Sequence, residues 1–194
     1  MDASFLPTLQ LVERCRAEAP WLAFAIAEQG TKESPGLGRN NSRILNYISA
    51  FPTLRNVDHL IRDPKTHKKV PSGFKMSQVD ETPWCACFVA WCLGRAGQPA
   101  IGMTPGAQGW MNFGVPLLKP RMGAIAVVYK KGASAATTSS GYHVAFYLRG
   151  PALAPTLVGG NQGNRVCAKD FRGWSVKAYR WPSTFRPALP PNLA

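Results

Sequence analysis

The stretch PWCACFVAWCLGRAG, residues 83–97, decides the fold because it joins a helical repeat to a reactive residue at its start. Side chains at three- and four-residue spacing share one helical face: Cys85, Phe88, Val89, Cys92 and Leu93. Thr82 can cap the amino end, Pro83 suits the first turn, and Gly97 is a natural stop. We therefore expect a buried central helix that begins close to Cys85.

Cys85 is the candidate nucleophile of this helix. The thiolate is the reactive form of cysteine, and a helix amino terminus with a neighbouring histidine lowers the thiol pKa from about 8.5 to roughly 3.5–7.5. Cys87 and Cys92 lie further into the helix, where we expect them to pack as small hydrophobic side chains. The competing interpretation of Cys85 is an ordinary buried thiol, so its assignment depends on partners elsewhere in the chain.

The segments around the central helix predict an α+β fold. Helical spacing covers residues 5–17, 21–29 and 42–51, whereas residues 52–82 look irregular and basic. From residue 123 the period changes to two, which predicts an antiparallel sheet of strands at residues 123–129, 142–148, 156–160, 165–170 and 175–181. We expect one domain over residues 1–194, with an extended, proline-rich tail at 183–194.

His143 is the candidate general base. It stands in the strand-like YHVAFYL after the Gly-, Ser- and Thr-rich stretch 132–141, which we expect to be a flexible loop. His59 and His67 lie in the basic region, where a solvated loop histidine is the simpler interpretation. In VGGNQGNRV, Asn161 is the first choice for the residue that orients the imidazole, with Gln162 as the alternative and an ordinary turn as the simplest explanation.

Cofactors are not expected. Cys85 and Cys87 lie on divergent sides of the helix and the chain has no C-x-x-C pair, so we expect no zinc site. Five cysteines are too few and odd in number for a disulfide framework. Trp84, Trp110, Trp174 and Trp181 could stack on substrate, and Trp84 adjoins the nucleophile, although core packing is the simpler role for each.

The composition limits the partners of the protein. With 23 basic and 10 acidic residues the formal net charge is +13, and many of the bases fall between residues 55 and 75. This region is either a solvated basic loop or a surface that attracts an anionic cell wall. It holds one aromatic residue, Phe74, so the stacking platforms of single-strand nucleic-acid binders are missing. We expect no membrane insertion, and residues 1–20 lack the pattern of a secretory signal.

The order of the three motifs resembles the NlpC-type and CHAP-type cysteine peptidases, a superfamily with a permuted papain-like fold. PWCACFVAWCL is similar to their nucleophile helix, YHVAFYL to the strand with the base, and LVGGNQGNRV to the segment with the orienting residue. The residues 20–48 also resemble the lead-in of a bacterial and phage subgroup, so the likeness spans about residues 20–182. One departure is Ala124, where members often carry an acidic residue after a glycine such as Gly123.

The resemblance implies a peptidoglycan hydrolase, either an endopeptidase or an N-acetylmuramoyl-L-alanine amidase, with Cys85, His143 and Asn161 as its catalytic residues. Together with the missing secretory signal, it leads us to expect synthesis in the bacterial cytoplasm and action in the periplasm or cell wall of a target cell. The protein would then be an antibacterial effector of the type VI secretion kind, partnered by an immunity protein or a secretion-machine component. Alternatives are a phage or prophage endolysin, and an inactive basic module that binds nucleic acid or wall polymer.

Overall fold

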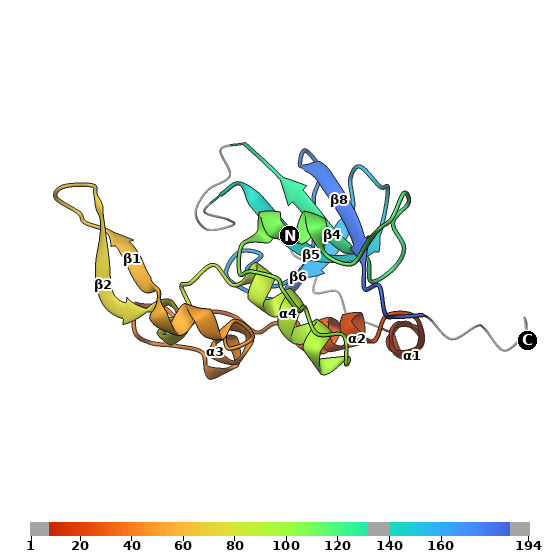
Figure 1. Ribbon diagram of the computed structural model, residues 1–194, viewed down its shortest axis with the longest axis horizontal. Coiled ribbons are helices and arrows are strands. Elements are labelled where there is room, and N and C mark those ends of the chain that lie inside the picture. The colour runs from red at the N-terminus through yellow and green to blue at the C-terminus, as the bar shows by residue number, and fades with distance from the viewer. Residues whose placement is uncertain (1–7, 132–139, 187–194) are drawn as a thin grey trace, which may run out of the picture.

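The computed structural model describes residues 8–131 and 140–186 and shows a mixed architecture of helices and antiparallel strands, an α+β fold. Four α-helices, α1 (Leu9–Glu18), α2 (Pro20–Ala27), α3 (Ser42–Ile48) and α4 (Cys85–Arg95), lie along one side of the larger sheet (Figure 1). Short 3-10 helices, η1 (Pro52–Asn56), η2 (Met76–Gln78) and η3 (Ala107–Asn112), occupy the connections.

The larger sheet has the strand order β3-β8-β4-β5-β6-β7. Its members are β3 (Val115–Pro116), β4 (Ile125–Tyr129), β5 (Tyr142–Arg149), β6 (Thr156–Gly159), β7 (Cys167–Asp170) and β8 (Ser175–Trp181). Every neighbouring pair is antiparallel. Because β4 and β5 lie in the middle of this sheet, their side chains are almost all buried, as central strands require.

The core lies between the sheet and α4. α4 packs on β5 and β6, and α2 packs on α4, so the central helix is buried on nearly all sides. Trp21 fastens α2 to the sheet through a hydrogen bond from its indole N–H to the carbonyl of Gly123 (2.7 Å). Phe185 of the described part of the tail packs its ring edge-on against Trp21, with centroids 4.9 Å apart, and so holds that part against the helices.

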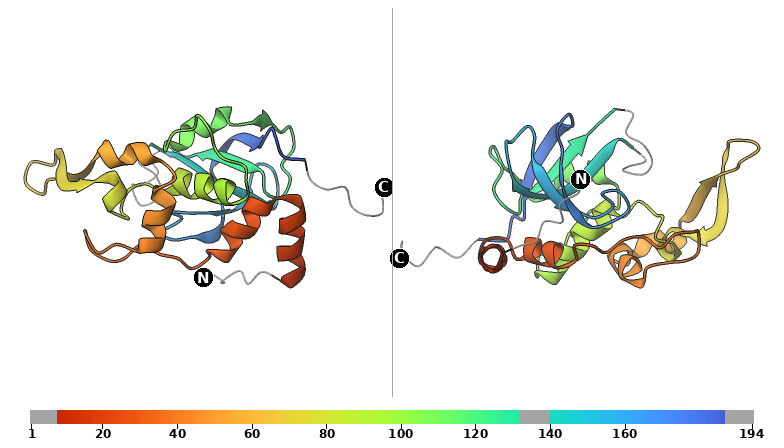
Figure 2. Two further views of the ribbon diagram at one scale, coloured as in Figure 1. Left: turned by 60° about the horizontal axis from the view of Figure 1, so that its bottom comes forward. Right: turned by 180° about the vertical axis from the view of Figure 1, so that it is seen from behind.

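A second sheet consists of one hairpin, β1 (Asp58–Arg62) and β2 (Lys69–Lys75), which projects from one end of the molecule beyond α3 (Figures 1 and 2). The prediction that residues 52–82 are irregular is therefore wrong. Pro71 and Gly73 are unfavourable in strands and concealed the strand pattern, but a two-stranded ribbon has two free edges that accommodate them. His59 is buried on β1 rather than solvated, whereas His67 is exposed at the hairpin tip.

The other predicted helices and strands are present in outline. The four helices and the five strands after residue 123 are present with bounds shifted by a few residues, and the short β3 is additional. The predicted cap is wrong: Trp84 occupies the N-cap position of α4, and the Thr82 hydroxyl donates instead to the carbonyl of Met76 (2.6 Å). The expected flexible loop (132–141) falls mainly outside the described residues, as do residues 5–7 and 187–194.

Candidate active site

Cys85 is the first residue of α4 and faces the larger sheet. Only 5% of its surface is exposed, and its thiol lies against the backbone amide of Val144 on β5. Burial raises the pKa of this thiol, while hydrogen bonding to the backbone of Val144 and Ala86 acts in the opposite direction. In the resting protein Cys85 is therefore a thiol rather than a thiolate.

His143 is the residue on β5 directly before Val144 and is 2% exposed. Its Nε2 lies 3.1 Å from Oε1 of Gln162, while its Nδ1 is buried and has no hydrogen-bond partner among the described residues. Burial lowers the pKa of His143 to about 4. The imidazole is therefore neutral near pH 7, although Gln162 favours the protonated form.

The carboxamide of Gln162 fixes the tautomer of His143. Its Nε2 donates to the carbonyl oxygens of Cys167 (2.5 Å) and Leu157 (3.4 Å), so its Oε1 is the acceptor that faces the imidazole. The proton of the neutral ring then sits on Nε2, because only that nitrogen can donate to Oε1. Nδ1 keeps a free lone pair, which is the state that a general base requires.

Asn161 does not make the hydrogen bond that the sequence analysis assigned to it first. Its backbone is left-handed, with φ of +56°, and its buried Oδ1 has no partner among the described residues. The neighbouring side chain, Gln162, is the one that reaches His143. Asn161 lines the small pocket beside the imidazole but does not orient it.

Two aromatic side chains cover His143. The Phe171 ring stacks on the imidazole with centroids 5.3 Å apart and planes at 12°, and Trp174 meets its edge at 6.5 Å. Both come from the end of β7 and the turn that leads into β8. The pocket that they form with Asn161 has a volume of about 10 Å³, which holds about one water molecule. The site is therefore closed in this structure.

Trp84 supports the site by packing. Its ring is fully buried, its indole N–H donates to Glu33 (2.8 Å), and a side chain on Gly160 would bring a Cβ within 2.3 Å of its Cζ3. The same Cβ would lie 2.7 Å from Cβ of Phe88. Gly160 thus lets the strand end that precedes Gln162 approach the start of α4.

We expect Gly160→Ala to destabilise the protein, since either the helix or the strand end must move to admit the methyl group. Overpacking of this kind costs roughly 1–3 kcal/mol, which lowers the melting temperature of a chain of this size by about 3–10 °C. Gly94→Ala is the matched control, because nothing lies within 4 Å of its added Cβ and alanine favours the helix more than glycine does. An unchanged melting temperature in Gly160→Ala, measured by thermal denaturation, would contradict the close packing.

All five cysteines are free thiols, and burial raises the pKa values of Cys87 and Cys92. Trp110 and Trp181 are buried in the core, so of the four candidate tryptophans only Trp174 lies beside the imidazole. Within the described ranges, no group of three His, Cys, Asp or Glu side chains is arranged to hold a metal ion.

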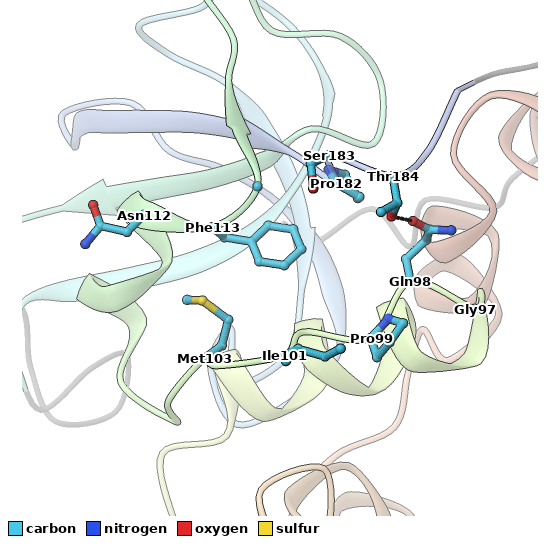
Figure 3. A pocket seen from close by; sticks show the side chains of 11 residues that line it. Gly97, Gln98, Pro99, Ile101, Met103, Asn112, Phe113, Pro182, Ser183 and Thr184 are labelled. Atoms are coloured by element: carbon cyan, nitrogen blue, oxygen red, sulfur yellow. Dashed lines mark hydrogen bonds between the residues drawn. The ribbon is translucent and has the colours of Figure 1, made fainter.

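A separate cavity of about 480 Å³ lies at the far end of α4, between Gly97 and the segment at Thr184 (Figure 3). Figure 3 shows Phe113 and Met103 among its walls, and the Thr184 hydroxyl donates to Oε1 of Gln98 (2.7 Å). Its lining contains no cysteine, histidine or charged side chain. It therefore offers neither a thiol nor an imidazole for amide hydrolysis.

Sequence reasoning missed the aromatic cover and the carbonyl groups that hold Gln162. Phe171 and Trp174 stand in a short turn with no motif around them, so only the three-dimensional structure places them on His143.

Fold and site together define an α+β protein with a buried thiol at the start of α4 and, on β5, a buried imidazole that is held by the carboxamide of Gln162. Among the described residues, no hydrogen bond joins Cys85 to His143. A scan against protein-family models and searches of curated proteins and solved structures each gave no significant match. None of the described helices is long and apolar enough to cross a membrane.

Proposed function

We propose that the protein is a cysteine hydrolase that cleaves an amide bond in the peptides of bacterial peptidoglycan. The observation that carries this proposal is the set of contacts around His143. Gln162 binds Nε2 of His143 and leaves Nδ1 with a free lone pair. Val144, the next residue of β5, contacts the Cys85 thiol through its backbone. A nucleophile, a base and an orienting group are the three parts of a Cys–His–amide mechanism.

In the proposed reaction, Nδ1 of His143 takes the thiol proton as Sγ of Cys85 attacks the scissile carbonyl carbon. A C–S bond forms, and the carbonyl π electrons move to the oxygen. The C–N bond then breaks as His143 returns the proton to the leaving amine, which leaves a thioester. Water attacks the thioester with His143 again accepting a proton, and the C–S bond breaks to release a carboxylate and the thiol.

The start of α4 supplies donors for the oxyanion. Trp84 at the N-cap makes no side-chain capping hydrogen bond, and the backbone amides of Cys85 and Ala86 lie close to the thiol. A helix amino terminus of this kind carries partial positive charge and unpaired N–H groups. We assign the Cys85 N–H to the oxyanion hole.

Substrate access requires the aromatic cover to move. Cys85 and His143 are almost fully buried, and the pocket beside the imidazole holds about one water molecule. Trp174 is partly exposed on a turn, so its displacement disturbs the core less than movement of β5 would. We propose that a bound peptide displaces this turn and brings its carbonyl to Cys85.

The permuted papain-like arrangement forms part of the same proposal. It is supported by the chain order of a helix-borne Cys85, the strand residue His143 and then Gln162, and by the packing of α4 on β5.

For the biological setting we propose an antibacterial effector, with an endolysin as the alternative. An effector is toxic when directed to the periplasm and is neutralised by a dedicated immunity protein, whereas an endolysin lyses cells from outside.

We expect Gln162→Ala to lower kcat by roughly 10²-fold while KM changes little. The loss is smaller than the ~10⁴-fold effect of disabling a triad aspartate, because a neutral amide stabilises the imidazolium less than a carboxylate does. Imidazole ¹⁵N shifts should show a mixture of tautomers in this variant, a change that a purely structural role does not require. Asn161→Gly is the control, since it keeps the left-handed backbone and removes a side chain without a bond to His143. An equal loss in both variants would contradict the assignment.

The decisive experiment is digestion of purified sacculi followed by mass spectrometry of the soluble fragments. Each hydrolysed amide adds one water and exposes a new amine and a new carboxylate. Free stem peptides indicate an amidase, whereas cuts within the peptide indicate an endopeptidase. Fragments identical to those from untreated sacculi would reject the proposed function.

A further inference from the structure

The tip of the β1–β2 hairpin concentrates positive charge on a projecting arm. β1 and β2 pair antiparallel, and the arm projects beyond the larger sheet at one end of the molecule (Figures 1 and 2). The tip sequence RDPKTHKK, residues 62–69, carries four exposed cations: Arg62, Lys65, Lys68 and Lys69.

Two of these cations face each other across the hairpin. Arg62 is the cross-strand partner of Lys69, and like charges in directly opposed positions destabilise a strand pair. At the base of the same hairpin the opposed residues carry opposite charges: Asp58 faces Lys75, and their side chains form an ion pair at 2.6 Å. The opposition of Arg62 and Lys69 therefore acts against the hairpin, whereas a guanidinium N–H of Arg62 donates to the carbonyl of His67 (2.6 Å) and ties Arg62 to the tip.

The single carboxylate of the tip does not neutralise these cations. Oδ1 of Asp63 accepts hydrogen bonds from the backbone N–H groups of Lys65 (2.9 Å) and Thr66 (2.6 Å) and from the Thr66 hydroxyl. Those bonds lower the pKa of Asp63 and use its charge to shape the loop. The ion pairs found between described residues do not include Lys65, Lys68 or Lys69. The tip is thus a preformed loop with unneutralised positive charge.

We propose that this tip binds the free carboxylates of peptidoglycan stem peptides and holds the polymer beside the active site. An anion placed between Arg62 and Lys69 removes their mutual repulsion and gains two charge-assisted hydrogen bonds. The arm lies close to the nucleophile in the chain, because only residues 76–84 separate the end of β2 from Cys85. The choice of polymer rests on the proposed function.

The same residues argue against the other common polyanions. Single-stranded nucleic acid needs repeated stacking platforms, and the hairpin has a single Phe, Tyr or Trp ring, the exposed Phe74, which lies beside Gly38. Membrane insertion needs apolar side chains at the leading edge, but Leu60 and Ile61 belong to the stem.

The test uses the full chain with Cys85→Ala, so that binding is measured without digestion, and sacculi free of phosphate polymers as the probe. We expect R62Q/K69Q to weaken co-sedimentation by about tenfold, since each exposed charge contact contributes up to roughly a factor of five. The control R16Q/K119Q removes the same charge from exposed positions outside the hairpin and leaves binding within about twofold. Amidation of the sacculus carboxylates should abolish the difference between the two double variants.

Lys69→Glu separates binding from hairpin stability. The new carboxylate faces Arg62, so amide exchange in β1 and β2 should slow by about twofold while binding to sacculi falls. Equal losses in R62Q/K69Q and R16Q/K119Q would overturn the proposal, as would binding that ignores carboxylate amidation. Tighter hairpin-dependent binding to a DNA duplex than to sacculi would replace it with a nucleic-acid site. Binding without hydrolysis by the native chain would reject the proposed function alone.

Discussion

Cys85→Ala should abolish the release of peptidoglycan fragments, with a fall in kcat of roughly 10⁵-fold or more. The substitution removes the only atom that forms the covalent intermediate, and losses of this size follow deletion of a nucleophile from a catalytic unit. Mass spectrometry of digested sacculi measures the fragments. Alanine occupies the site with only a small void, so circular dichroism and thermal melting should show a folded protein.

Cys87→Ala is the matched control for this variant. Cys87 lies on the same first turns of α4 and is fully buried, yet it has no place in the proposed reaction. We expect its kcat to stay within about threefold of the native value, because only a small buried group is lost. If Cys85→Ala keeps measurable turnover, or if both variants lose activity equally, the thiol of Cys85 is not the nucleophile.

His143→Gln should lower kcat by roughly 10⁴-fold, because the thiol then has no base and the leaving amine has no acid. The same muropeptide assay measures this loss. Turnover close to that of the native protein, unchanged by added imidazole, would reject His143 as the base.

The same variant also tests the burial of His143 through the pH dependence of stability. The folded pKa of about 4 lies below the usual 6.5, so between these values the unfolded chain binds a proton that the folded chain does not. Stability therefore falls as the pH drops from about 6.5 toward 4, and His143→Gln removes this contribution. Melting temperatures at pH 7 and pH 5 should differ less in the variant than in the native protein. An equal difference in both would show that His143 titrates normally in the fold.

The main elements could be predicted because periodicity reports burial. The apolar segments from Cys85 to Leu93 and from His143 to Leu148 indicated a helix and a strand, and the structure buries both on nearly every side. The hairpin escaped prediction because both of its faces are largely exposed, which removes the alternation that reveals a strand. The hairpin is therefore recognised from the pairing of β1 with β2 in the structure and not from its sequence pattern.

For the hydrogen bond to His143, the predicted segment is right but the first-choice residue is wrong, since Gln162 makes it rather than Asn161. Spacing identified the segment after β6, but the choice between Asn161 and Gln162 depends on the backbone at Asn161, which turns left-handed and directs the next side chain at the imidazole. Both residue types suit such a turn, so sequence alone could not separate them. The stacking of Phe171 on His143 joins residues far apart in the chain and has no local signal.

The burial of the Cys85 thiol also limits how fast oxidants react with it. Peroxides and disulfides react with exposed thiolates, and their rates fall with both the thiolate fraction and the accessibility of the sulfur. Cys85 is covered and its pKa is raised, so sulfenic acid forms slowly at its sulfur. Cys167, by contrast, is partly exposed and donates only to the backbone carbonyl of Gln162, which makes it the more accessible target for oxidants. Storage under air should therefore modify Cys167 well before Cys85.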